Sequence, residues 1–316
     1  MSPRRLLLDT ASLYFRAYYG VPMRYALDGT TPVNAVRGLL DMIAKFVRET
    51  HPDEVAACWD NDWRPSWRVA LVDTYKSHRV AGGASGAPAD PRLPVGAGGR
   101  GAESGVAEIA DATLSVQVPL IAEVLRAVGV PMVGADGYEA DDVIGTLATN
   151  APGHVDVVTG DRDLFQLVTD DVSILYVARG ISKYETVDDA WLATRYGLTG
   201  GQYVDYSVLR GDASDGLPGV AGIGEKTAGK LLAQYGDLES AVADPDHSPS
   251  IAARLAAAVD YIGRARQVVA VRTDLHLPGD LTLPREVEDP VAFETLTHDL
   301  ALGSAATRLA EAMRTR

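Results

Sequence analysis

The sequence predicts an α/β fold with a parallel sheet at its core and a smaller helical region after it. Two observations carry this prediction: short apolar runs alternate with longer segments of helical period, and strand character is lost from about Tyr196 onward. Such alternation is typical of parallel strands joined by helices. With 316 residues the chain has room for two fused domains, and we expect them at residues 1–195 and 196–316.

Four apolar runs have the length of buried strands: Leu6–Leu8, Val55–Trp59, Val155–Val158 and Val172–Val177. Helical spacing of apolar residues predicts helices at Val33–Val47, Pro119–Val128 and Ala140–Leu147. Residues 81–105 follow neither pattern, because glycine and proline dominate them and little is left to bury. We expect a flexible insertion there.

Composition limits the classes of function. The chain carries 43 acidic and 29 basic residues, a formal charge of −14, which excludes a protein that coats nucleic acid with its whole surface. Cys58 is the single cysteine, so neither an intrachain disulfide nor a cysteine zinc site can form. The first apolar run stops at Asp9, and no run approaches the roughly 20 residues of a membrane span. We therefore expect a cytoplasmic protein that binds no membrane.

Acidic residues follow three of the predicted strands and recur in two other segments. Because the carboxyl ends of parallel strands open on one crevice, acids far apart in sequence would meet there. Taken singly, each acid is more often a helix cap or a turn residue. Together they form five clusters whose mutual repulsion would be strong without cations. The nine carboxylates are Asp9, Asp60, Glu139, Asp141, Asp142, Asp161, Asp163, Asp212 and Asp215.

Hard divalent cations would relieve this repulsion, and Mg²⁺ or Mn²⁺ is favoured because neither His nor Cys accompanies the acids. Two such ions about 3.5 to 4 Å apart would activate water and stabilise the leaving oxygen of a phosphodiester. A structural Ca²⁺ site is the competing interpretation, but the sequence lacks the regular Asp-x-Asp-x-Asp-Gly loop. The pattern therefore predicts phosphodiester hydrolysis.

A glycine-rich segment, Leu217–Ala228, leads into a predicted helix, Lys226–Tyr235, that ends at Gly236. It differs from a nucleotide-binding P-loop, because Glu225 interrupts the Gly-Lys-Thr triplet and no strand precedes it. Glycines let another backbone approach closely, and a helix N-terminus offers amide donors to a phosphate. We interpret the segment as a helix-hairpin-helix that grips a DNA backbone without reading bases. The alternative is an ordinary turn between helices.

Residues 63–79 interleave four Lys or Arg residues with three aromatic residues and His78. Such a mixture suits a positively charged gate in which bases stack and phosphates are steered. A helix with a solvated charged face is the alternative, and a surface position is the simpler assignment for His78. The location directly after an acidic strand end favours the gate.

Together these residues resemble the bacterial 5′ nuclease family, which includes the N-terminal 5′-3′ exonuclease domain of DNA polymerase I, phage 5′ exonucleases and flap endonucleases. The matching motifs run in order from Leu8 to about Pro278. The resemblance implies a PIN-like α/β core with a helical arch, followed by a C-terminal helix-hairpin-helix. The motifs are Asp9 with Arg16–Tyr18, Asn34–Val36, Asp60, Tyr75–Lys76 with Arg79, Gly137–Asp142, Thr159–Asp163 with Gln166–Leu167, Gly211–Asp215, Leu217–Ala228 and Val271–Asp274.

The resemblance also implies roles for individual residues. A first metal ion would be held by Asp9, Asp60, Glu139 and Asp141, and a second by Asp141, Asp161, Asp163, Asp212 and Asp215, with Asp142 supporting either. The scissile phosphate and the 5′ strand would be handled by Arg16, Arg68, Lys76 and Arg79. Contacts to DNA would come from Tyr75, Gly222, Ile223, Gly224, Lys226 and Thr227, and some family members bind K⁺ at this hairpin.

The implied function is that of a stand-alone nuclease that removes 5′ flaps and degrades 5′ ends of DNA in replication or repair. Nicked and RNA-primed DNA would be further substrates, and the protein would associate with the nucleoid through DNA. Two other functions stay open. One is a structure-specific DNA-binding protein that cuts no bond, since a fold can be kept for binding alone. The other is a PIN-type ribonuclease, which would share the acids but would not need the hairpin.

Overall fold

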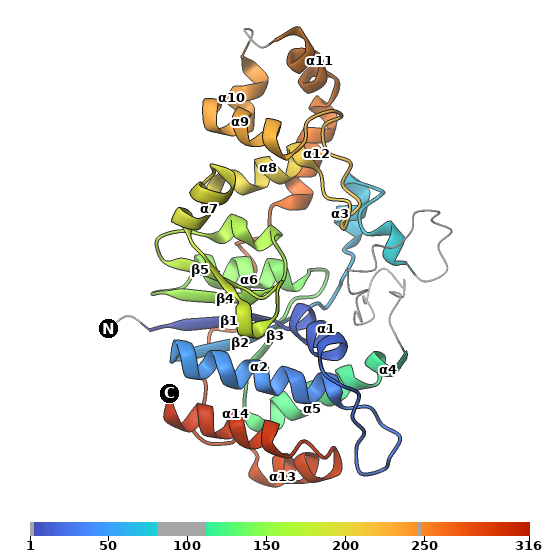
Figure 1. Ribbon diagram of the computed structural model, residues 1–316, viewed down its shortest axis with the longest axis vertical. Helices are drawn as coiled ribbons and strands as arrows, with labels where there is room; N and C mark the ends of the chain where they lie inside the picture. Colours follow the sequence, from blue (N-terminus) through green and yellow to red (C-terminus); the bar gives the residue numbers. More distant parts are fainter. Residues whose placement is uncertain (1–2, 81–111, 245–247) are drawn as a thin grey trace.

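The computed structural model describes residues 3–80, 112–244 and 248–316. Its centre is a six-stranded sheet in the order β3-β2-β1-β4-β5-β6 (Figure 1). The strands are β1 (Arg5–Asp9), β2 (Glu54–Trp59), β3 (Met132–Gly134), β4 (Val155–Thr159), β5 (Val172–Tyr176) and β6 (Glu185–Val187). All neighbours pair in parallel except β5 and β6, which are antiparallel. The predicted α/β class is confirmed, but the sheet is mixed rather than wholly parallel.

Both faces of the sheet are covered, which explains why its strands appear in the sequence as continuous apolar runs. In β1, Leu6 and Leu8 face one core cluster and Leu7 faces the other, in keeping with the two-residue repeat of a strand. The first cluster contains residues of α1 (Thr10–Gly20), α2 (Asn34–Thr50) and α5 (Gln117–Val128). The second contains α6 (Ala140–Thr149) and the 3₁₀ helix η2 (Asp163–Leu167). The three predicted helices correspond to α2, α5 and α6.

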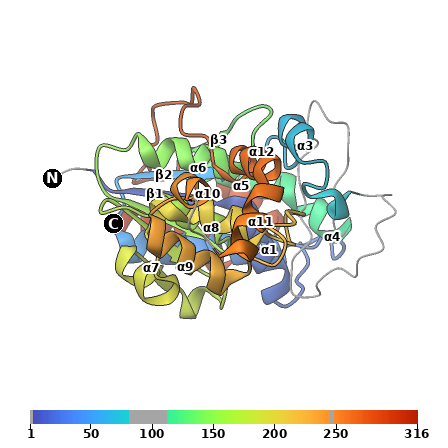
Figure 2. The ribbon, with the colours of Figure 1, turned by 90° about the horizontal axis from the view of Figure 1, so that it is seen from above.

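The helical region follows the sheet and shares its second core cluster. Tyr203 and Tyr206 are its largest fully buried side chains. Figure 1 shows this region above the sheet, and Figure 2, seen from above, shows α8, α9 and α10 lying over it. Its helices are α7 (Asp189–Tyr196), η4 (Gly200–Gln202), α8 (Tyr203–Arg210), α9 (Glu225–Tyr235), α10 (Leu238–Ala243), α11 (Pro249–Ala257) and α12 (Val259–Val269).

The last two helices, α13 (Pro290–Asp299) and α14 (Ser304–Thr315), return to the opposite side of the sheet. Leu309 and Met313 of α14 are fully buried in the first core cluster, together with residues of α2. By packing, these helices therefore belong with the α/β core, although they follow the helical region in sequence. The division at residues 195 and 196 stays a prediction.

The remaining elements are α3 (Ser66–Leu71), η1 (Ser77–Arg79), α4 (Ala112–Ser115) and η3 (Ile181–Lys183). Figures 1 and 2 both place α3 and α4 on the side toward which β1 runs. The insertion predicted at residues 81–105 lies outside the described residues. Within the described ranges, none of the helices has the length and apolar character needed to cross a membrane.

Candidate active site

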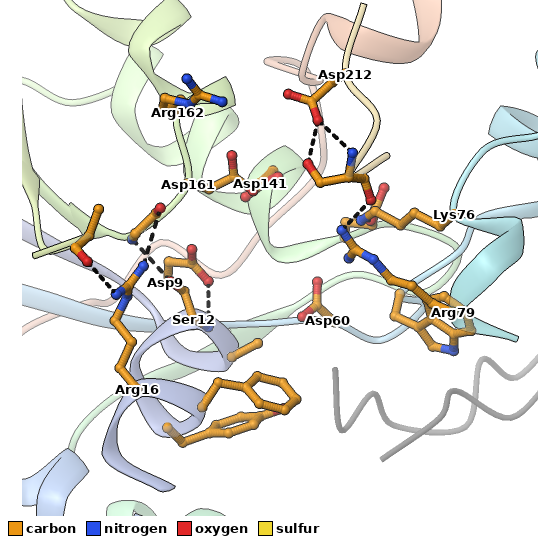
Figure 3. Close-up of a pocket in the computed structure, with 18 of the residues that line it drawn as sticks. Asp9, Ser12, Arg16, Asp60, Lys76, Arg79, Asp141, Asp161, Arg162 and Asp212 are labelled. Atoms are coloured by element: carbon orange, nitrogen blue, oxygen red, sulfur yellow. Dashed lines mark hydrogen bonds and ion pairs between the residues drawn. The ribbon is translucent and has the colours of Figure 1, made fainter. Parts of the chain in front are cut away.

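A cavity of about 450 Å³ opens where the parallel strands end. Residues from β1, the turn after β2, α1, α6, the turn after β4 and the turn after α8 line it, so the predicted convergence of distant acids is present (Figure 3). Two kinds of charge face each other across the space. Its carboxylates are Asp9, Asp60, Glu139, Asp141, Asp161 and Asp212, and its cations are Arg16, Lys76, Arg79 and Arg162.

Asp9 ends β1 and caps the N-terminus of α1. Its Oδ1 accepts a hydrogen bond from the Ser12 amide (3.2 Å), and its Oδ2 accepts one from the Thr159 hydroxyl (2.6 Å). Burial, supported by the negative charges of Asp60 and Asp161, raises the pKa of Asp9 to about 7. Without a bound cation, this carboxyl group is therefore partly protonated near neutral pH.

The N-terminus of α6 supplies Glu139 and Asp141 and fixes Asp60. The Ala140 amide donates to Asp60 Oδ1 at 2.8 Å, which ties the end of β2 to the first turn of α6. Burial raises the pKa of Asp60, and the charge of Glu139 adds to the effect. The pKa of Asp141 lies well above its ordinary value because of burial and the charges of Asp161 and Asp9. These groups are thus crowded beyond what their protein neighbours neutralise.

The turn after β4 brings Asp161 and Asp163 to the same place. Asp161 Oδ1 accepts from the Asp163 amide at 2.9 Å. Asp163 Oδ1 is buried and has no hydrogen-bond partner within the described part of the chain. Burial and the charge of Asp161 raise the pKa of Asp163 well above its ordinary value. Asp163 and Asp215 line a small adjoining cavity of about 10 Å³ that shares Asp141 with the main one.

The turn after α8 holds Asp212 and Asp215 through its own hydrogen bonds. The Ser214 amide donates to Asp212 Oδ1 at 2.8 Å, and Arg210 pairs with Asp212 Oδ2 at 2.9 Å. Arg79 pairs with Asp215 at 2.9 Å and also donates to the Ser214 carbonyl at 2.7 Å. The turn is therefore clamped to η1, which carries Arg79, one of the predicted phosphate-handling residues.

Lys76 lies directly beside the acids. Its backbone is left-handed (φ 46°), and its amide donates to the Asp215 carbonyl at 2.9 Å. Its Nζ pairs with Glu139 Oε1. Burial alone would lower the pKa of Lys76, but Glu139, Tyr75 and Asp215 together outweigh burial, and the pKa lies well above its ordinary value. Lys76 therefore stays protonated and positive.

Arg68, Asp142 and Tyr75 form a buried network behind the main cavity, and Arg68 and Tyr75 also line the small adjoining one, so their predicted contacts with substrate or metal stay predictions. Arg68 is 2% exposed and pairs with both oxygens of Asp142 (2.7 and 2.8 Å) and with Glu139. Asp142 is fully buried and also accepts from the Arg272 amide at 2.9 Å. The Tyr75 hydroxyl donates to Glu139 at 2.7 Å. The hydrogen bonds of Arg68 thus use four of its five N–H donors, both oxygens of Asp142 are engaged, and the ring of Tyr75 is buried.

The predicted hairpin has the expected form. Gly222 has φ +76°, and α9 begins at Glu225 directly after Gly224 and ends at Gly236 (φ +84°). The side chain of Ile223 is buried in the core, so this residue supports the hairpin from inside rather than contacting DNA. Lys226 is exposed and Thr227 is half-buried on the first turn of α9.

Sequence reasoning missed Arg162, which it treated only as the spacer between Asp161 and Asp163. The structure places it on the wall of the cavity, on the same side as Arg16 (Figure 3). Arg16 lies on α1, seven positions after Asp9, and donates to the Ala178 carbonyl at 3.1 Å. The only available signal was the position of Arg162 after a strand end.

The ligand atoms of the cavity suit a hard cation, although the described side chains are not arranged in a complete coordination shell. Within the described ranges, no three His, Cys, Asp or Glu side chains are arranged to hold a metal ion as they stand. The donors are nevertheless all carboxylate oxygens, which Mg²⁺ and Mn²⁺ prefer. The unpartnered Asp163 Oδ1 and the raised pKa values of Asp9, Asp141 and Asp161 show a surplus of negative charge.

Two family models match the chain. One, described as 5′-3′ exonuclease, N-terminal resolvase-like domain, covers residues 4–197, and the other, 5′-3′ exonuclease, C-terminal SAM fold, covers residues 198–289. A 5′-3′ exonuclease of Streptomyces coelicolor is 49% identical over 312 residues, which cover 96% of this chain and 98% of the relative. A 5′-3′ exonuclease of Mycobacterium tuberculosis is 42% identical over 327 residues, covering 98% of each.

Solved structures with the same fold include the bacteriophage T5 D15 protein co-crystallised with metal ions. It has a TM-score of 0.63 and 14% identity, over 98% of both chains. A variant of the T5 D15 flap endonuclease, in a pseudo-enzyme-product complex with DNA and metal ions, has a TM-score of 0.61 and 14% identity. The match covers 99% of this chain and 100% of that one.

Proposed function

This chain belongs to the 5′-3′ exonuclease family, and on that premise we propose that it hydrolyses DNA phosphodiesters at 5′ flaps and 5′ ends with Mg²⁺ or Mn²⁺. One observation carries the proposal: six carboxylates from five separate segments line one cavity together with four cations. Several of these acids have raised pKa values, which is the electrostatic state expected of a site built to receive divalent cations.

The residues that would hold the cations are those that reach the two cavities. Asp9, Asp60, Glu139 and Asp141 would hold one ion, and Asp141, Asp161, Asp163, Asp212 and Asp215 the other. Bound there, divalent cations would supply an activated water and charge stabilisation for the leaving oxygen. Lys76 and Arg79, now paired with Glu139 and Asp215, would turn to the scissile phosphate as those acids engage a cation.

The helical region would hold the duplex through the hairpin. Gly222 and Gly224 allow a close backbone approach, and the exposed Lys226 adds a positive charge at the start of α9. We propose that K⁺ binds at the same hairpin. RNA-primed DNA and nicked DNA are further proposed substrates, and such substrates would bring the protein to the nucleoid. We propose residues 1–195 for the chemistry and residues 196–316 for the duplex, apart from α13 and α14, which pack against the α/β core.

A flap-cleavage assay with product mapping tests the proposal. The full chain is incubated with a labelled 5′-flap duplex in Mg²⁺, Mn²⁺ or EDTA, and the cut position is read at nucleotide resolution. We expect cleavage near the flap junction in either metal and none in EDTA. Asp141→Asn keeps the side-chain shape but removes a shared ligand, so it should lose at least about a hundredfold in rate.

The matched control is Asp170→Asn, which removes an exposed acid between η2 and β5. It should cut like the wild type. Activity that survives EDTA, or an Asp141→Asn variant as fast as the control, would refute the metal-dependent mechanism. A duplex with an RNA flap, cut faster than the DNA flap, would point instead to a ribonuclease. Binding of the flap without any cut would point to a protein that only binds DNA.

A further inference from the structure

The cations that line the cavity fall into two groups. Lys76 is ion-paired with Glu139, and Arg79 with Asp215. Arg16 and Arg162 form no ion pair with any residue in the part of the chain that the structure describes. Figure 3 shows these two arginines on one side of the labelled carboxylates and Lys76 and Arg79 on the other. The cavity therefore has a second basic wall, whose two arginines form no ion pair within the described ranges.

Arg16 is held in place by backbone carbonyls. Its Nη1 donates to the Ala178 carbonyl at 3.1 Å, and its Nη2 is 3.5 Å from the Gly160 carbonyl. Its Nε is buried and has no hydrogen-bond partner among the described residues. Burial lowers the pKa of Arg16, although the charges of Tyr176, Asp9 and Asp161 oppose the effect. The side chain is thus positioned and desolvated but not neutralised.

Arg162 is half-buried on the turn after β4. Its nearest electrostatic neighbours are mostly tyrosines, Tyr203, Tyr196 and Tyr176. Within the described residues, its guanidinium makes no hydrogen bond or ion pair. A half-buried guanidinium that makes no ion pair gains stability when an anion binds beside it. An anion that enters the cavity would be such a partner.

The chemistry of the two side chains indicates which anion. A guanidinium presents a planar fork of donors that matches the oxygens of a phosphate, and it stays charged throughout the accessible pH range. A nucleic acid that enters the cavity brings phosphates next to the one being cut.

We propose that Arg16 and Arg162 form a subsite for a second phosphate, adjacent to the scissile phosphodiester and across the carboxylates from Lys76 and Arg79. The proposal rests on the proposed function and adds Arg162 as a substrate-binding residue. The bound group is either an internal phosphodiester or a terminal 5′-phosphate. Both present the same oxygens, and the test separates them.

The test is single-turnover cleavage of a DNA flap in Mg²⁺ by the full chain. Each linkage within two nucleotides of the cut is replaced in turn by an uncharged methylphosphonate, and a parallel pair of duplexes carries a 5′-phosphate or a 5′-hydroxyl one nucleotide from the cut. With the wild type, removal of one such charge should slow cleavage about tenfold, the value of a charged hydrogen bond. Arg162→Gln should cleave the unmodified flap more slowly than the wild type. Removal of the same charge from the DNA should then cause no further decrease in its rate.

The control is Arg195→Gln, an exposed arginine on the last turn of α7. It should respond to every charge deletion like the wild type. Arg162→Lys keeps the charge without the fork and should recover part of the rate. Coupling at an internal linkage identifies an internal phosphodiester as the ligand, whereas coupling only to the 5′-phosphate identifies the terminal group.

Equal responses of wild type and Arg162→Gln at all positions would overturn the subsite. In that case the wild type would still cut the flap, so the proposed function would stand. A wild type that does not cut in Mg²⁺ would contradict the proposed function itself. The two failures are therefore distinguishable in the same experiment.

Discussion

Replacement of Arg68 by alanine distinguishes a structural counter-ion from a residue that handles substrate. Arg68 and Asp142 are both almost fully buried, and they share two hydrogen bonds of 2.7 and 2.8 Å. Arg68 also pairs with Glu139 and donates to the Val268 carbonyl at 3.0 Å, which ties α3 to α6 and α12. The alanine variant would leave the buried Asp142 without its cation and Glu139 with Lys76 alone. Loss of one partner of a buried pair costs about 3–5 kcal/mol.

Thermal unfolding followed by circular dichroism in EDTA measures this loss. For a chain of this size we expect a decrease in Tm on the order of 10 °C, from roughly 2–4 °C for each kcal/mol. Arg64→Ala is the matched control, because Arg64 lies on the same segment and its guanidinium donates to two backbone carbonyls, those of Tyr75 (2.7 Å) and Asp73 (3.3 Å). It should lose about 1 kcal/mol. If Arg68→Ala had the Tm of the wild type but cleaved DNA slowly, Arg68 would not be a structural counter-ion. It would instead bind the scissile phosphate.

Three further predictions concern the metal, the pH and the hairpin. Mg²⁺ at a hundred times its Kd should raise the free energy of unfolding by about 2.7 kcal/mol, measured by calorimetry, and Asp141→Asn should lose most of this gain. In EDTA, the pKa of Asp9 is about 7 in the folded protein and 3.8 in the unfolded chain. Protonation of Asp9 therefore stabilises the fold fully below pH 3.8, and this stabilisation is lost as the pH rises through about 7. The Tm of wild type relative to Asp9→Asn should therefore fall across that window, and a constant difference would contradict the assigned pKa. Gly222→Ala should destabilise the protein by about 1 kcal/mol or more, since φ is +76° and the new Cβ would meet the Arg254 guanidinium. Gly224→Ala has open space and an extended backbone and should unfold at nearly the wild-type temperature.

Much of the fold could be predicted because the buried strands are long enough to leave a pattern. β1, β2, β4 and β5 have five or six residues each and were found as apolar runs. β3 and β6 have only three residues each, too few for any period to show. The antiparallel direction of β6 and the return of α14 to α2 depend on tertiary packing, about which local patterns are silent.

The acids of the site could be predicted because parallel strand ends meet at one place, whatever their distance in sequence. The basic and aromatic residues could not be sorted in the same way. Arg68 and Tyr75 lie in the same basic and aromatic segment, residues 63–79, as Lys76. An arginine can be a buried counter-ion or an exposed phosphate contact, and the sequence does not distinguish the two. Only burial separates the two roles, and burial is decided by α6 and α12, which pack on α3 from distant parts of the chain.

The formal charge of −14 then has a local explanation. The acids of the cavity repel a phosphate, and Lys76, Arg79 and Arg210 are each paired with one of its carboxylates or their neighbours. Under the proposed function, the scissile phosphate would reach Lys76 and Arg79 as divalent cations replace those pairs, since the same acids cannot hold both. Entry of the scissile phosphate and binding of the cations are thus coupled through the same carboxylates. In the absence of metal, DNA affinity should rest on the hairpin of the helical region and on the two unpaired arginines, Arg16 and Arg162, and it should decrease steeply with salt.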